Sequence, residues 1–305
     1  MLLFAARRLM LAVLVALTVS VICFFLLHLS GDLAQALAGS SSSASDVEAV
    51  RKAYGLDRPI IVQYLGWASR VLTGDLGQSY FFKEPVAKLI AERLPVTMVL
   101  GVCALVFAVA LALPLGVVAA LRPNSWIDRT ALTISVLGQA LPSFWFALML
   151  IIVFGLTLRW LPISGSGTWQ HLVLPSIALG YYATPAIMRL TRAGMIEVLA
   201  SDYIRTARAK GLRAPSVLFK HALRNAVIPV VALAAVQFGF MLGGSIVIET
   251  VFALHGIGYL AWESIARADF PIVQAIVLIL ASVYVVLTFL ADILNAFLDP
   301  RLRVG

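Results

Sequence analysis

A basic, amphipathic stretch lies between two long apolar runs in the second half of the chain. It reads SDYIRTARAKGLR at residues 201–213 and continues as APSVLFKHALRN at residues 214–225. Lysine and arginine collect in those loops of a membrane protein that remain in the cytoplasm. We therefore expect a structured cytoplasmic segment between two membrane spans, where a soluble partner can reach it. From the residues alone, a basic loop without any partner is an alternative.

The first part of this stretch has the pattern of a short helix. Ser201 and Asp202 are expected to cap its N-terminus, because such side chains accept hydrogen bonds from free backbone amides. Gly211 predicts its end, because glycine adopts the left-handed conformation without a penalty from Cβ. The residues expected on one face are Tyr203, Ala207, Lys210 and Ala214, and the small residues that would let a partner approach closely are Thr206, Ala207 and Ala209.

The composition is that of an integral membrane protein. Of the 305 residues, 61% are hydrophobic and only 12% are charged, and the mean hydropathy is +0.98. Soluble domains carry about 25% charged residues. The apolar runs are long and nearly uncharged, which predicts helical spans and an all-α fold. A formal net charge of +8 then reflects cytoplasmic loops and not nucleic-acid binding.

Six apolar runs are long enough to cross a bilayer, which takes about 20 helical residues. The count of six includes the fourth run, residues 172–188, for which an extension to residue 199 is an alternative. The first run is too long for a typical signal peptide, although Ala36-Leu37-Ala38 resembles a cleavage site, so we expect a retained helix. The predicted spans are residues 9–29, 96–121, 131–158, 172–188, 227–248 and 272–298.

The chain divides into two parts. Residues 1–95 are expected to hold the first span and an extracytoplasmic segment of small helices with a serine-rich link at residues 40–45. Residues 96–305 hold the other spans, and the basic stretch at about 200–226 lies between two of them. The short outer loops contain only Arg159 and Arg267, whereas the inner segments are rich in arginine and lysine. This asymmetry places both termini in the cytoplasm.

We find no motif for catalysis, for a metal or for a bound cofactor. The sequence has no nucleotide-binding glycine loop and no nucleophile triad, and Cys23 and Cys103 lie in apolar runs as packing residues. The spans do contain a few polar residues, Gln139, Ser143 and Gln237, which either line a pathway or bond one helix to another.

Charged residues near the span ends have two interpretations each. Glu249 and Asp292 are either an ion relay or acids at span edges, and Asp292 could pair with Arg301 or Arg303. Arg189 and Arg192 either reach lipid phosphates or pair with Glu197.

The spacing Ala207, Gly211 and Leu223 resembles the coupling loop of the permeases of ATP-binding-cassette importers. That loop has Ala, Gly four residues later and Leu twelve further on, within a general form that begins Glu-Ala-Ala and ends Ile-x-Leu-Pro. Here Arg205-Thr206 stands for Glu-Ala, His221 for Ile and Arg224 for Pro, which resembles the peptide and nickel branch of the family.

Further blocks along nearly the whole chain resemble the same branch. Residues 74–79 and 93–97 are similar to its outer segment, 160–162 and 174–176 to the loop before the fourth span, and 249–252, 256–258 and 269–274 to its last outer loop. Residues 299–301 are similar to its tail. One departure is Gly31-Asp32-Leu33, where the branch usually has Gly-Asp-Pro, and it affects only the expected local outer structure.

The resemblance implies the first permease of an ATP-driven importer, with the six-helix type I fold and no catalytic activity. It implies partners as well: a second permease, two ATPase subunits that hold ATP and Mg²⁺, and an extracytoplasmic binding protein. The implied solute is a dipeptide, an oligopeptide or glutathione, and nickel or another metal chelate is the alternative. The coupling residues carried over are Asp202, Tyr203, Arg205, Thr206, Ala207, Arg208, Lys210, Gly211 and Leu223.

Two alternative functions come from other classes of membrane protein. An ion-coupled secondary transporter would need acids near the bilayer midplane and an inverted repeat, and neither is evident. A membrane-embedded hydrolase would need a nucleophile and a base, or metal ligands, within the spans, and none converge.

Overall fold

The computed structural model describes residues 2–29, 33–38, 42–53 and 55–298, and these residues form helices joined by short links. A single isolated bridge, between Gln78 and Pro85, is the one β-type pairing among them. The first part contains α1 (Leu2–Leu29), α2 (Leu33–Ala38), α3 (Ala44–Ala53) and α4 (Ile60–Leu72). The second contains α5 (Val86–Leu121), α6 (Trp126–Ala140), α7 (Ser143–Leu150), the π-helix η1 (Ile151–Thr157), α8 (Gln170–Tyr181), α9 (Thr184–Leu199), α10 (Asp202–Ala209), the π-helix η2 (Ser216–Leu223), α11 (Arg224–Ala226), α12 (Ile228–Val251), α13 (Ile257–Ala266) and α14 (Phe270–Leu298).

Among the described residues, four helices are long and apolar enough to cross a membrane: α1, α5, α12 and α14. The predicted spans at 9–29, 96–121 and 272–298 fall within α1, α5 and α14, and the span at 227–248 begins one residue before α12. Helix α5 begins ten residues earlier than the predicted span, at Val86, because Pro95 and the charged residues before it are accommodated inside the helix. The serine-rich link, the Gly31-Asp32-Leu33 turn and the 299–301 tail lie wholly or partly outside the described residues.

The other two predicted spans are broken helices. The prediction of one continuous helix over 131–158 is wrong, because Leu141 is extended and a new helix starts after Pro142. Proline disfavours the helical conformation of the residue before it and lacks an amide for the preceding turn. The run at 172–188 is divided between α8 and α9, and Pro185 stands in the first turn of α9, where proline is tolerated.

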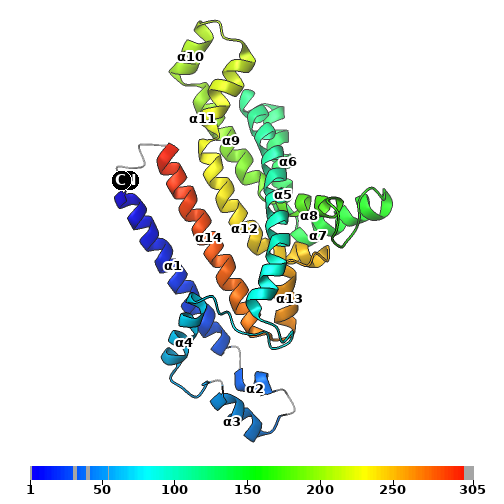
Figure 1. The fold of residues 1–305 in the computed structure, drawn as a ribbon. Coiled ribbons are helices and arrows are strands. Elements are labelled where there is room, and N and C mark those ends of the chain that lie inside the picture. The colour runs from blue at the N-terminus through cyan, green and yellow to red at the C-terminus, as the bar shows by residue number, and fades with distance from the viewer. Residues whose placement is uncertain (1, 30–32, 39–41, 54, 299–305) are drawn as a thin grey trace.

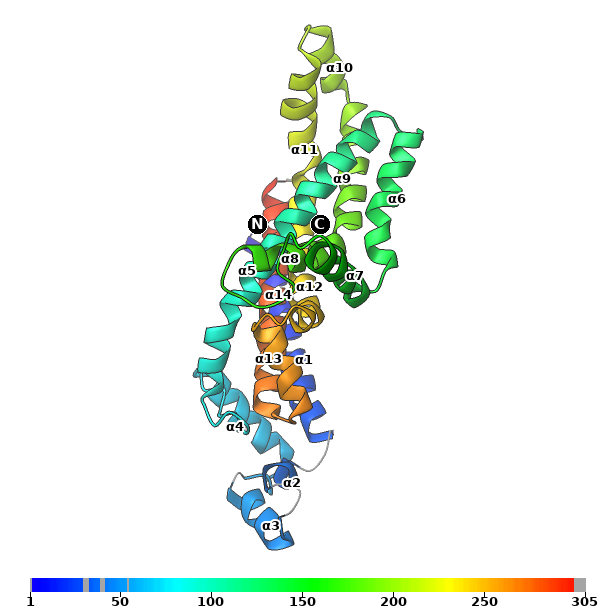
Figure 2. The same cartoon turned by 90° about the vertical axis from the view of Figure 1, so that its right-hand side faces the viewer.

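The long helices lie side by side, and shorter helices lie at both ends (Figure 1). Helix α1 packs on α14, α14 on α12 and α12 on α5, while α5 also packs on α8 and α9. The α10–α11 segment projects beyond one end of these helices, and α2, α3 and α4 lie at the opposite end, as both views show (Figures 1 and 2). Helices α7 and α8 turn sideways from the bundle.

Small residues let α5 approach its neighbours closely. Ala104, Ala108, Ala112 and Gly116 recur every four residues along α5 and are buried. A Cβ atom at Gly116 would lie 2.7 Å from Cβ of Thr191 in α9. Helix association in a membrane depends on such close packing, because lipid tails are as apolar as the side chains they replace.

A hydrogen-bonded junction joins α5, α12 and α13 around Glu249. The buried Glu249 carboxylate accepts bonds from Thr97 Oγ1 at 2.7 Å and from the backbone amide of Tyr259 at 2.9 Å. Thr97 Oγ1 in turn accepts from the amide of Ile257 at 2.9 Å. The carboxylate therefore satisfies the first turn of α13, where a negative charge is favourable. These bonds assign Glu249 a structural role, and a Cβ at Gly256 would collide with both Thr97 and Glu249.

A second junction holds the 79–82 loop on the α13–α14 turn. Asp269 is buried and accepts bonds from the hydroxyl of Ser79 and from the amides of Tyr80 and Phe81, the last two at 3.1 Å. The guanidinium carbon of Arg267 lies 3.6 Å from the centre of the Phe81 ring. Two blocks that are far apart in sequence, 74–79 and 269–274, are thus in contact through Ser79 and Asp269.

Candidate coupling arm and pathway cavity

The basic stretch forms a helical arm, which we define as residues 200–226. It leaves the bundle at the end of α9 and returns into α12, so it is tied to two of the long helical elements (Figure 1). Within it, α10 is followed by a short link, by η2 and by α11.

The arm has a small apolar core of its own. Ile204 is fully buried and Ala207 is only 8% exposed, and both belong to a cluster with Val217 and Ala222 from η2 and Met195 from α9. The expected face with Tyr203, Ala207, Lys210 and Ala214 is therefore wrong, because Tyr203, Lys210 and Ala214 are exposed while Ala207 packs inward. Leu223 is half-buried against the same cluster.

The predicted side-chain cap at the start of α10 is absent. Ser201 makes no cap bond, and its hydroxyl instead donates to the carbonyl of Val198 at 2.6 Å. The Asp202 carboxylate accepts from Arg205 one turn later. Tyr203 Oη accepts from Asn225 Nδ2 at 2.8 Å, which ties α10 to α11.

The predicted left-handed Gly211 is confirmed, with φ of +74°. The amide of Leu212 donates to the carbonyl of Ala207 at 3.3 Å, and the amide of Gly211 donates to that of Arg208 at 2.9 Å. This pair of bonds is the Schellman arrangement, which ends a helix at a left-handed glycine. A Cβ at Gly211 would meet nothing within 4 Å, so the requirement for glycine comes from the backbone conformation alone.

The outer surface of the arm is basic. Arg205, Arg208 and Lys210 are exposed, as are Thr206 and the whole link from Gly211 to Pro215. The arm therefore presents cations on a surface held in shape by the Ile204 core and the Gly211 turn.

An ion pair with a buried carboxylate joins α6 to α9, the helix that leads into the arm. Asp128, in the first turn of α6, is 2% exposed and accepts from Nε and Nη2 of Arg192 in α9, both at 2.6 Å. It also accepts from the amide of Asn124 at 2.8 Å. The bonds from Arg192 hold the pKa of Asp128 below its ordinary value. The expectation that Arg192 contacts lipid or Glu197 is wrong. Asp128 was not predicted as its partner, although Ser125 and Asp128 have the spacing of a helix-start motif.

Another ion pair joins the first and last long helices. Arg8 Nη1 of α1 lies 2.8 Å from Asp292 Oδ2 of α14. The expected partners, Arg301 and Arg303, lie outside the described residues.

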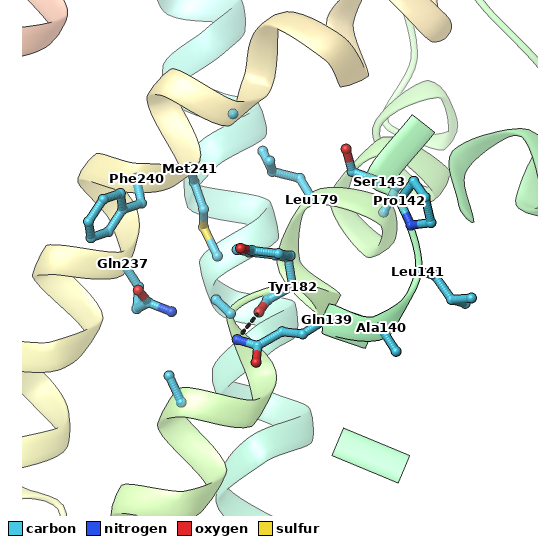
Figure 3. A pocket seen from close by; sticks show the side chains of 14 residues that line it. Gln139, Ala140, Leu141, Pro142, Ser143, Leu179, Tyr182, Gln237, Phe240 and Met241 are labelled. Carbon is cyan, nitrogen blue, oxygen red and sulfur yellow. Dashed lines mark hydrogen bonds between the residues drawn. The ribbon is translucent and has the colours of Figure 1, made fainter. Parts of the chain in front are cut away.

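A cavity of about 810 Å³ opens beside the break between α6 and α7 (Figure 3). The three polar residues singled out from the sequence, Gln139, Ser143 and Gln237, all line it, although they come from three different helices. Gln139 Nε2 also donates to the backbone carbonyl of Tyr182 at 3.3 Å. The sequence left two alternatives for these residues, lining a pathway or bonding one helix to another. Gln139 does both, because it lines the cavity and bonds to Tyr182.

The remaining lining residues are apolar or aromatic. Tyr182, Phe240 and Met241 contribute the largest side chains, and none of the fourteen lining residues carries a charge. These three residues were not predicted, because hydropathy does not distinguish an apolar side chain that faces a cavity from one that faces lipid. The cavity offers both hydrogen-bond donors and acceptors on an otherwise apolar wall.

These features define a polytopic, all-helical membrane protein with a cavity among its helices and a structured polar arm beyond them. The chain belongs to the family of inner membrane components of binding-protein-dependent transport systems. Residues 112–304 match the main family description and residues 1–101 match that of its N-terminal part.

Named relatives are similar over nearly the full length. The glutathione transport system permease protein GsiC of Escherichia coli K12 is 42% identical over 286 residues, which cover 93% of this chain and 94% of the relative. The protein of the same name from Pectobacterium atrosepticum is 42% identical over 288 residues, with 94% of each covered. A chain from the crystal structure of an amino acid ABC transporter with histidines has a TM-score of 0.49 and 19% identity, covering 70% of this chain and 94% of that one.

The family assignment confirms several expectations. The chain is the permease subunit of an ABC importer, a multi-pass inner membrane protein without catalytic activity, and ATP is hydrolysed on its partner ATPases. Membership implies a complex with those ATPases and a binding protein. It excludes the secondary transporter and the membrane hydrolase as descriptions of this chain.

Proposed function

We propose that this chain forms half of the passage for glutathione or another short peptide, and that the helical arm couples it to ATP hydrolysis. The second half comes from a related permease. The single observation that carries the proposal is the uncharged cavity at the α6–α7 break, with amides of Gln139 and Gln237 on its walls. Amide side chains both donate and accept hydrogen bonds, which suits a peptide backbone, and the name of the relatives supports glutathione.

The cavity suits transit more than tight binding. Each hydrogen bond contributes only about 0.5–1.5 kcal/mol net, so a few amides on an apolar wall hold a peptide weakly. High affinity then belongs to the binding protein, and the passage needs only to replace part of the hydration of the peptide.

Filling the cavity tests this role. We expect Gly244→Trp to abolish ATP-dependent uptake, because Gly244 lines the cavity and an indole there would occupy it. The matched control is Gly243→Trp, since the neighbouring Gly243 does not line the cavity and its Cβ would meet nothing within 4 Å. The measurement is uptake of labelled glutathione, a labelled dipeptide and nickel by proteoliposomes that hold the assembled transporter.

Two results would count against the proposal. Equal uptake by the Gly244→Trp and Gly243→Trp transporters would show that solute does not use this cavity. Nickel uptake without peptide uptake by the wild-type transporter would replace the peptide assignment with the metal alternative.

The proposed topology has six spans with both termini in the cytoplasm. Residues 131–157, from α6 into η1, and residues 172–188, from α8 into α9, each count as one broken span in addition to the four long helices, and Asp128 and Arg192 lie beyond the cytoplasmic ends of these two spans. The position of the arm and of α2–α4 at opposite ends of the bundle (Figure 1) supports opposite sides of the membrane.

Thiol labelling tests this topology. In a chain with Cys23 and Cys103 replaced by alanine, a cysteine at Ser42 should react with an impermeant reagent in intact cells, and one at Pro215 should react only after lysis. Equal labelling of both sites in intact cells would contradict the six-span arrangement.

In the proposed coupling, α10 and the link after it dock in a groove on an ATPase. Arg205, Arg208, Lys210 and Thr206 supply the contact surface, and Asp202, Tyr203, Ala207, Gly211 and Leu223 hold its shape. ATP-driven closure of the ATPases would move the arm and, through α9 and α12, the walls of the cavity. This is coupling through an element with two arrangements.

A further inference from the structure

Helix α4 has a wider apolar surface than its contacts with the rest of the chain can cover. Its inner side carries Tyr64 and Trp67, which pack on α1 through ring contacts with Phe24 at centroid distances of 5.4 and 5.6 Å. A separate stripe carries Ile61, Leu65 and Leu72, which are 67%, 60% and 88% exposed. With Ala68 between them, these positions recur at intervals of three and four residues and so lie on one side of the helix.

The position of α4 along α1 indicates how deep in the membrane this stripe lies. The apolar span of α1 runs from Ala5 to Phe25, and α4 contacts it inside that range. Tyr64 Oη is 2.9 Å from the hydroxyl of Ser20, which stands five residues, or about 7 Å, before the end of the span. Helix α4 therefore overlaps the part of α1 that the bilayer surrounds (Figure 1).

The apolar stripe is separate from the polar side of α4. The polar side of α4 points elsewhere, because Gln63 Nε2 donates to the carbonyls of Leu56 and Arg58 in the turn before the helix, at 3.1 and 2.8 Å. Tyrosine and tryptophan in such a helix are typical of the membrane–water interface.

We infer that α4 is an interfacial helix whose Ile61–Leu65–Leu72 stripe is covered by lipid acyl chains. It anchors the extracytoplasmic segment to the bilayer and so holds the 73–85 loop close to the membrane surface. The inference rests on α1 being a membrane span, as in the proposed function. Amphipathic helices bind at this depth by burying such a stripe between headgroups and acyl chains.

Spin labels test this in full-length protein reconstituted in phosphatidylethanolamine and phosphatidylglycerol vesicles. Single cysteines replace Leu65 or Leu72 in a chain with Cys23 and Cys103 changed to alanine. Gly66→Cys is the matched control, because Gly66 is exposed on the polar side of the same helix and its Cβ would meet nothing within 4 Å. Val13→Cys, on the exposed surface of α1, is the lipid reference.

Collisions with oxygen, which enters lipid, are compared with collisions with a polar nickel chelate, which does not. The ratio of the oxygen collision rate to the nickel-chelate collision rate at Leu65 and Leu72 should match the ratio at Val13. It should exceed the ratio at Gly66 about tenfold, because polar solutes are excluded from hydrocarbon. A ratio at both sites equal to that at Gly66 would place the stripe in water, and low collision with both reagents would place it against protein. Either result overturns the inference, whereas a water-like ratio at Val13 would instead show that α1 is no span.

Discussion

Gly211→Val is expected to abolish uptake while the permease remains folded in the membrane. Gly211 has φ of +74°, and a residue with Cβ there costs roughly 1–2 kcal/mol. That cost is small beside a domain stability of about 5–15 kcal/mol. It is large enough to open the two hydrogen bonds that end α10, which would move Arg205 and Arg208 away from their docking positions.

The control for this variant is Gly211→Asn. Asparagine adopts the left-handed conformation more readily than other residues with a Cβ, and no neighbouring atom would obstruct it. We expect the Asn variant to retain much of the uptake. The readouts are uptake and the stimulation of ATP hydrolysis by the loaded binding protein. Normal stimulated hydrolysis and uptake by the Val variant would show that the arm is not the coupling element.

Asp128→Ala is expected to cause the largest loss of stability. It leaves the Arg192 guanidinium, which is largely buried, without its two short bonds. Removing one partner of a buried pair costs about 3–5 kcal/mol, and the partial exposure of Arg192 reduces this to roughly 2–3 kcal/mol. The measurement is the unfolding temperature of the purified permease in detergent. The double variant Asp128→Ala/Arg192→Ala should lose less than the sum of the single variants, because neither charge is then left alone.

The same pair predicts an acid dependence of stability. Arg192 lowers the pKa of Asp128 in the folded chain, so the pair stabilises the fold at neutral pH. This contribution should fade as the pH falls below about 4, the ordinary value for aspartate. A purely additive double variant, or an Asp128→Ala protein with the same unfolding temperature and the same acid response as wild type, would contradict the assigned role.

Local features of this fold could be predicted from the sequence. Gly211 is one, because its conformation depends on the backbone of a single turn. The four long helices are another, because each apolar run is itself long enough to span a bilayer.

Features that depend on tertiary contacts could not be predicted in the same way. The break between α6 and α7 is an exception, because Pro142 is a local signal for it, and it was missed because hydropathy continues through Leu141 and Pro142. The buried position of Ala207 depends on Val217 and Ala222, which return from the second half of the arm. Asp128 and Arg192 are 64 residues apart, and nothing in the sequence pairs them. The three polar cavity residues could be named but not brought together, because they come from separate helices.

The central claim is that the helical arm contacts an ATPase, and crosslinking tests it most directly. A photoreactive amino acid in place of Arg208, on the exposed surface of α10, should crosslink to an ATPase subunit in the assembled transporter. The same amino acid in place of Lys52, exposed in α3 at the opposite end of the molecule, should not. Efficient crosslinking to the ATPase from position 52, or none from position 208 in an intact complex, would contradict the account.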